Sequence, residues 1–152
     1  AELAEEPGVV AIEWHVDYWD DLIHGGSRWK DPFSSPDFTA RQGRYNIMLR
    51  GTSGVYTPQA VIQGAHEMTG SRRGEVRAAI EAAPRSSARV AFDESGTVRL
   101  SGEGEGRVML VSLLHHRDTQ VTGGENKGRQ LSSRNIVRRV HDLGEWSGGQ
   151  AR

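Results

Sequence analysis

The chain is 152 residues long, enough for one ordinary domain or two small ones, and it contains no cysteine. Its 19 lysine and arginine residues nearly balance its 20 aspartate and glutamate residues, and the two signs are interspersed. This balance argues against nucleic-acid and anionic-membrane partners, and no apolar run is long enough to span a membrane. The absence of thiols excludes a disulfide, a thiolate nucleophile and a thiolate metal site within this chain.

The first residues predict a step from helix to strand. Residues 1–6 favour a helix, which Pro7-Gly8 stops. Residues 9–12 are apolar and mostly β-branched, and apolar and polar residues then alternate up to Asp17, a pattern typical of a buried strand. The stretch from Asp20 to Pro36 has no periodicity and is predicted to be a long loop.

A helix is predicted over residues 36–50, because Ser35 is a favourable N-cap, Pro36 suits the first helical position, and apolar residues recur on one face. A strand headed by proline follows and ends near Ile62. We then expect a two-residue turn at Gly64-Ala65 and a return strand over residues 66–68.

Ser71 is the predicted N-cap of a second helix, which ends before Pro84. Beyond Arg85 the pattern changes to short strands separated by glycine-rich turns, which predicts an antiparallel sheet with a long hairpin tip at residues 123–128. The segment 134–143 fits either a helix or a strand, and we favour a strand. The change of pattern predicts two units, residues 1–84 and 85–152.

Five motifs occur in order along the chain: His15–Asp20, Trp29–Ser35, Arg41-Gln42, Val55–Gln59 and Gly124–Arg129. Together they resemble the domain of unknown function 1223 family. The order of elements in the first half is similar to a thioredoxin fold that lacks its first strand and the start of its first helix. Thr57-Pro58 stands where that fold has its cis-proline. The predicted fold class is therefore α/β and thioredoxin-like, followed by a β-rich antiparallel region.

The resemblance implies a periplasmic or secreted bacterial protein with no established activity. Family members usually carry a Cys-x-x-Cys motif just upstream of the position where this chain begins, and further strand sequence beyond the position where it ends, so we expect a fragment truncated at both ends. In its intact form such a protein is expected to be linked to thiol-disulfide redox chemistry. The alternative is a non-enzymatic binding or structural module on a thioredoxin-like scaffold. This chain alone is not expected to be an enzyme, and neither a cofactor nor an oligomeric state is predicted.

Polar and aromatic residues around the predicted long loop are the first candidates for a site. Glu13, His15 and Asp17 share one face of the predicted strand and lie near Asp20. They can form a metal site or an acid-base group, or they can be a polar strand end that caps neighbouring turns, which is the reading we favour. No catalytic or metal-binding residue is assigned. The aromatic residues of the loop either form the wall of a ligand cleft or pack the loop onto the core, and packing is favoured.

Two further motifs complete the candidate set. Arg41 or Gln42 is expected to tie the first helix to Asp17, Asp20 or Asp31. By resemblance, a cis-proline turn leaves backbone groups of the preceding residue free to receive an extended protein or peptide substrate. The candidate binding residues are His15, Asp17, Trp19, Asp20, Trp29, Arg41, Gln42, Tyr56, Thr57, Pro58 and Gln59.

Overall fold

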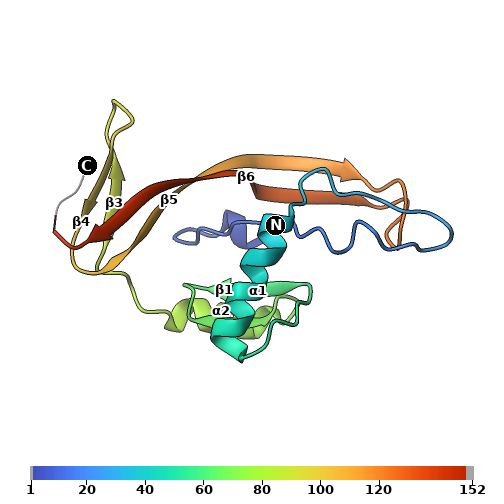
Figure 1. Ribbon diagram of the computed structural model, residues 1–152, viewed down its shortest axis with the longest axis horizontal. Helices are drawn as coiled ribbons and strands as arrows, with labels where there is room; N and C mark the ends of the chain where they lie inside the picture. Colours follow the sequence, from blue (N-terminus) through green and yellow to red (C-terminus); the bar gives the residue numbers. More distant parts are fainter. Residues whose placement is uncertain (1, 150–152) are drawn as a thin grey trace.

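The computed structural model describes residues 2–149 as a mixed α/β protein. Within these residues it has two α-helices and six strands, and the strands form three separate antiparallel pairs. The elements are α1 (Pro36–Arg50), β1 (Gln59–Ile62), β2 (His66–Thr69), α2 (Arg73–Ala82), β3 (Arg89–Phe92), β4 (Val98–Ser101), β5 (Glu105–Gln120) and β6 (Gln130–Ser147). The β5–β6 ribbon runs along the length of the molecule, with the β3–β4 hairpin at one end and α1, α2 and β1 below its middle (Figure 1).

Helix α1 has the predicted bounds and the predicted N-cap, and its C-terminal end is capped by glycine. Ser35 has an extended backbone, and its side chain accepts a hydrogen bond from the Asp37 N–H at 3.2 Å. Gly51 ends the helix with a φ of 70°, and its N–H donates to the Ile47 carbonyl at 3.0 Å. A left-handed glycine at this position satisfies carbonyls that the helix leaves unpaired.

The hairpin and second helix follow the predicted order with two local corrections. Three residues separate the paired Ile62 and His66, and Gln63 and Gly64 take positive φ values of 49° and 70°. The prediction of a Gly64-Ala65 turn was therefore wrong by one residue. Ser71 does not cap α2 either, because the first helical bond runs from the Val76 N–H to the Arg72 carbonyl, which places Ser71 outside the helix.

The ambiguous segment 134–143 lies within strand β6, so the strand prediction is confirmed. The pairing of β5 with β6 shifts register between Val108 and Met109 and again between Ser112 and Leu113. At each shift β6 contains one extra residue, and such bulges reverse the alternation of faces. The resulting three-residue spacing of apolar positions along β6 explains why the segment also fits a helix.

The segment 9–16 does not form the predicted regular strand. Glu13 makes a single parallel bridge to β6, in which its N–H donates to the Asn135 carbonyl at 3.1 Å and its carbonyl accepts from the Val137 N–H at 3.0 Å. Within residues 2–149 no strand runs beside 9–16 for longer than such isolated bridges, so a continuous ladder cannot form. Residues Glu2–Glu5 form a short 3-10 helix in place of the predicted helix end.

The molecule is extended, and its buried core is small. The accessible surface is 10577 Å² for a mass of 16.7 kDa, whereas a compact monomer of this mass exposes about 7600 Å². Ile136 and Val137 are fully buried where β6 meets the segment 9–16. This junction is therefore a buried support for a site near the N-terminal segment. None of the described helices is both long and apolar enough to cross a membrane.

Candidate functional site

The backbone around His15 is held from two sides. On the ribbon side, the Asn135 side-chain amide donates to the Ala11 carbonyl at 2.9 Å. On the helix side, the Ser35 N–H donates to the His15 carbonyl at 3.1 Å. The imidazole is therefore placed between β6 and the start of α1 by hydrogen bonds that do not involve its own ring.

The His15 ring lies between two carboxylates. Its Nδ1 is 2.6 Å from Oδ2 of Asp31, and its Nε2 is 3.5 Å from Oε2 of Glu13. Burial lowers the pKa of His15, but the bonds and charges of Asp31 and Glu13 outweigh burial and raise this pKa to about 9. Burial raises the pKa of Glu13, while bonds from His15 and the Arg134 N–H outweigh it, so this pKa lies below its usual value. At neutral pH the imidazole is an imidazolium.

Two aspartates fold the loop that follows. Asp20 accepts from the Asp31 N–H at 3.1 Å through one oxygen and from the Ser34 hydroxyl at 2.6 Å through the other. Asp31 accepts from the Phe33 N–H at 2.8 Å. These bonds fix the loop end so that the Asp31 carboxylate faces His15.

A tight turn carries His24 toward the same region. The backbones of His24 and Ser27 exchange two hydrogen bonds of 3.1 and 3.0 Å, and both intervening residues, Gly25 and Gly26, have positive φ values. Two central residues with positive φ define the type I′ turn, for which glycine pairs are well suited.

The tip of the β5–β6 hairpin packs against this loop. A Cβ atom at Gly123 would collide with the Arg28 carbonyl, so the close approach requires glycine there. The next residue, Gly124, donates its N–H to the Ser27 hydroxyl at 3.2 Å. The contact brings Glu125 and Asn126, more than a hundred residues along the chain from His15, to the same place.

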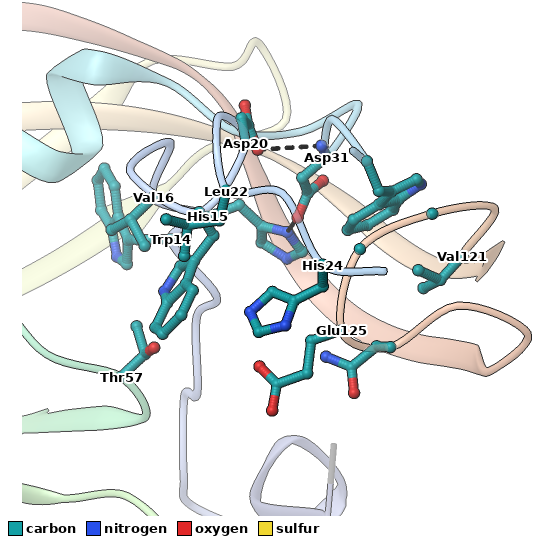
Figure 2. A pocket seen from close by; sticks show the side chains of 15 residues that line it. Trp14, His15, Val16, Asp20, Leu22, His24, Asp31, Thr57, Val121 and Glu125 are labelled. Atoms are coloured by element: carbon teal, nitrogen blue, oxygen red, sulfur yellow. Dashed lines mark hydrogen bonds and ion pairs between the residues drawn. The ribbon is translucent and has the colours of Figure 1, made fainter. Parts of the chain in front are cut away.

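These segments enclose a cleft with a volume of about 460 Å³, which lies within the range of small-ligand sites. Figure 2 shows that the side chains of His15, His24 and Glu125 extend toward a common space, with Thr57 and Val121 on opposite sides. The cleft is lined by Trp14, His15, Val16, Trp19, Asp20, Leu22, His24, Trp29, Asp31, Thr57, Val121, Gly123, Gly124, Glu125 and Asn126. Its wall is thus built from three tryptophans, three carboxylates and two histidines.

A family of proteins of unknown function, DUF1223, matches this sequence over residues 1–152. The chain belongs to the DUF1223 family. The crystal structure of protein AGR_C_4864 from Agrobacterium tumefaciens is similar to this DUF1223 chain with a TM-score of 0.72 and 27% sequence identity. The match covers 94% of this chain and 62% of that one, so the chain spans less than two thirds of that protein's length. No curated protein matches the sequence.

In this DUF1223 chain five of the eleven candidate residues line the cleft: His15, Trp19, Asp20, Trp29 and Thr57. The other six lie outside it: Asp17, Arg41, Gln42, Tyr56, Pro58 and Gln59. Asp17 does not join His15 at the cleft, because it accepts a hydrogen bond from the Thr39 hydroxyl while His15 pairs with Asp31. Among the described residues no group of three or more histidines and carboxylates is arranged to hold a metal ion.

The expected tie from Arg41 or Gln42 to the loop aspartates was also wrong. The Arg41 guanidinium stacks between two aromatic rings, 3.9 Å from the centroid of Trp14 and 4.7 Å from that of Tyr45. Burial lowers the pKa of Arg41, but the stacked cation remains charged at neutral pH. The Gln42 amide instead donates to the Tyr56 carbonyl at 2.6 Å. Arg41 therefore positions the lining residue Trp14, and Gln42 positions Tyr56, which precedes the lining residue Thr57.

Three cleft residues were absent from the candidate set: His24, Glu125 and Asn126. The Gly25-Gly26 pair is a hairpin-turn signal that would have placed His24 beside a tight turn. Glu125 and Asn126 belong to the Gly124–Arg129 motif and to the predicted hairpin tip, but the contact of this tip with Arg28 depends on tertiary structure, so no local pattern placed them at the cleft.

Proposed function

We propose that this chain binds an extended peptide segment in the tryptophan-lined cleft, by pairing with the backbone beside Thr57. The observation that carries this proposal is the free backbone of Thr57. Among the described residues, neither its N–H nor its carbonyl takes part in a hydrogen bond, and the residue is exposed. The carbonyls of the two neighbouring residues are already hydrogen-bonded, since the Tyr56 carbonyl accepts from the Gln42 side chain and the Pro58 carbonyl accepts from the Gly70 N–H.

An exposed backbone donor and acceptor can receive a strand of another chain, and pockets beside them then accept alternate side chains of that strand. Thr57 lines the cleft, so a peptide paired with it would extend toward Trp14 and Trp19. Trp19 is 45% exposed and offers apolar surface without unfolding the loop. Non-covalent binding does not require a thiol, so it is compatible with a chain that contains no cysteine.

The test uses three blocked pentapeptides, acetyl-Ala-Ala-Xaa-Ala-Ala-amide, with lysine, norleucine or glutamate at the centre. We expect at least one of them to change the tryptophan fluorescence of the 152-residue chain in a saturable way. N-methylation of the central peptide amide removes one backbone donor and should weaken binding about threefold to tenfold. The proposal is abandoned if none of the peptides binds at millimolar concentration, or if the N-methylated peptide binds as well as its parent.

A second candidate function is thiol-disulfide exchange by an intact parent protein of the bacterial periplasm or exterior, in which this chain supplies the peptide groove. The thioredoxin-like order of α1, β1, β2 and α2 supports it, as does the position of Thr57-Pro58 at the head of β1, where the peptide bond is cis. The experiment expresses the parent gene and compares reduction of a model disulfide by the protein and by a cysteine-free variant. Equal rates would contradict thiol-disulfide exchange and leave peptide binding as the remaining proposed function.

A further inference from the structure

The charge of the cleft wall is one-sided. Asp20, Asp31 and Glu125 line the cleft, and none of the described residues that line it is lysine or arginine. The nearest basic residues along the chain, Arg28, Lys30 and Lys127, lie outside the lining. Cleft walls of one charge sign raise the local concentration of ligands of the opposite sign.

The imidazolium of His15 does not reverse this balance. It lies between Asp31 and Glu13, at 2.6 and 3.5 Å, so two carboxylates face one positive ring. The carboxylates of Asp20 and Asp31 also accept hydrogen bonds from backbone N–H groups of the loop. Glu125 differs from them, because its carboxylate makes no hydrogen bond or ion pair with any described residue. Its full hydrogen-bonding capacity is available to a ligand.

The aromatic part of the wall suits a cation as well. Indole faces attract ammonium and guanidinium groups more strongly than other aromatic rings do. One face of Trp14 already holds the Arg41 guanidinium at 3.9 Å. Trp19 and Trp29 line the cleft, and no described cation stacks on either ring. Tyr18 packs against Trp19 with ring centroids 5.5 Å apart, so the cleft combines two indole rings that hold no cation with an unpaired carboxylate.

We propose that the cleft recognises a lysine or arginine side chain of the bound peptide, whose cationic group meets the Glu125 carboxylate and the indole faces of Trp19 and Trp29. This inference rests on the proposed peptide binding and adds the class of side chain selected. It assigns the charge selectivity to Glu125, since the other two lining carboxylates are engaged within the loop.

The same three peptides test this inference separately from peptide binding itself. Lysine and norleucine have side chains of similar length and differ in the charged group. We expect the lysine peptide to bind about fivefold tighter than the norleucine peptide, and the glutamate peptide to bind weakest. Equal binding of lysine and norleucine would overturn the cationic selectivity and leave the peptide-binding proposal intact. No binding of any peptide would end both.

A matched pair of variants locates the selectivity. Glu125→Gln keeps the size of the side chain and should weaken binding of the lysine peptide about threefold, with no change for norleucine. Glu94→Gln, in the exposed turn between β3 and β4, is the control and should alter neither affinity. Retained lysine preference in Glu125→Gln, with an unchanged circular dichroism spectrum, would contradict the assignment to this carboxylate.

Discussion

The His15 imidazole and the Asp31 carboxylate, which are sixteen residues apart in the sequence, lie 2.6 Å apart in the wall of the cleft. Their side chains are only 16% and 17% exposed, so water screens the pair weakly. The pair joins the N-terminal segment to the end of the long loop. It therefore holds two segments of the cleft wall together.

This pair makes stability depend on pH. In the unfolded chain His15 titrates near 6.5, and in the folded protein its pKa is about 9. The stabilisation is therefore complete below pH 6.5 and is lost as the pH rises through 9, with a total of about 3 kcal/mol. Urea unfolding at a series of pH values should show this decline. NMR titration of the imidazole should give a midpoint near 9, and a midpoint near 6.5 would contradict the geometry.

Asp31→Asn keeps an oxygen for the Phe33 N–H and removes the charge. We expect the pKa of His15 to fall toward its ordinary value and the alkaline loss of stability to shrink. His141→Gln, on an exposed part of β6, should leave both quantities unchanged. An unchanged His15 titration in Asp31→Asn would show that Glu13 alone controls it.

Gly123→Ala tests the contact between the hairpin tip and the loop. The new methyl group would meet the Arg28 carbonyl, so the tip must move away, and we expect a loss of about 1–3 kcal/mol together with weaker peptide binding. Gly106→Ala in β5 is the control, since a Cβ there meets nothing and the φ is ordinary. Thermal melts of both variants give the comparison, and equal melting temperatures would refute the contact.

Gln42→Ala tests the brace behind Thr57. The substitution leaves the Tyr56 carbonyl without its donor and should cost about 1–2 kcal/mol in the free energy of unfolding. Peptide affinity should fall too, because Tyr56 precedes the residue proposed to pair with the ligand. Gln130→Ala, exposed at the start of β6, should change stability by less than about 0.5 kcal/mol.

Arg41→Lys tests the stacked guanidinium. Lysine keeps the charge but loses the planar group between Trp14 and Tyr45, so we expect a loss of about 1 kcal/mol and a shift in tryptophan fluorescence. Arg44→Lys, exposed on the same helix, is the matched control. If both variants unfold at the same urea concentration, the stacking contributes nothing to stability.

Local signals predicted most of the elements. Ser35, Pro36 and Gly51 bound α1, and short antiparallel strands lie beyond Arg85 as predicted. Errors occurred where a neighbouring segment decides the conformation. The segment 9–16 has the composition of a strand, but without a continuous partner it forms only isolated bridges.

The sequence by itself determined the absence of thiol chemistry within this chain, the bounds of α1, the order of the hairpin and second helix, and the presence of tryptophans and acids around a long loop. These properties depend on residue type and on neighbours within a few positions, which is the range of caps, turns and periodicity. Only the tertiary structure decided that His15 pairs with Asp31 and that Glu125 joins the cleft. Both depend on contacts between segments distant in sequence, and the second requires the Gly123 backbone to lie against Arg28, a close approach that no local pattern encodes.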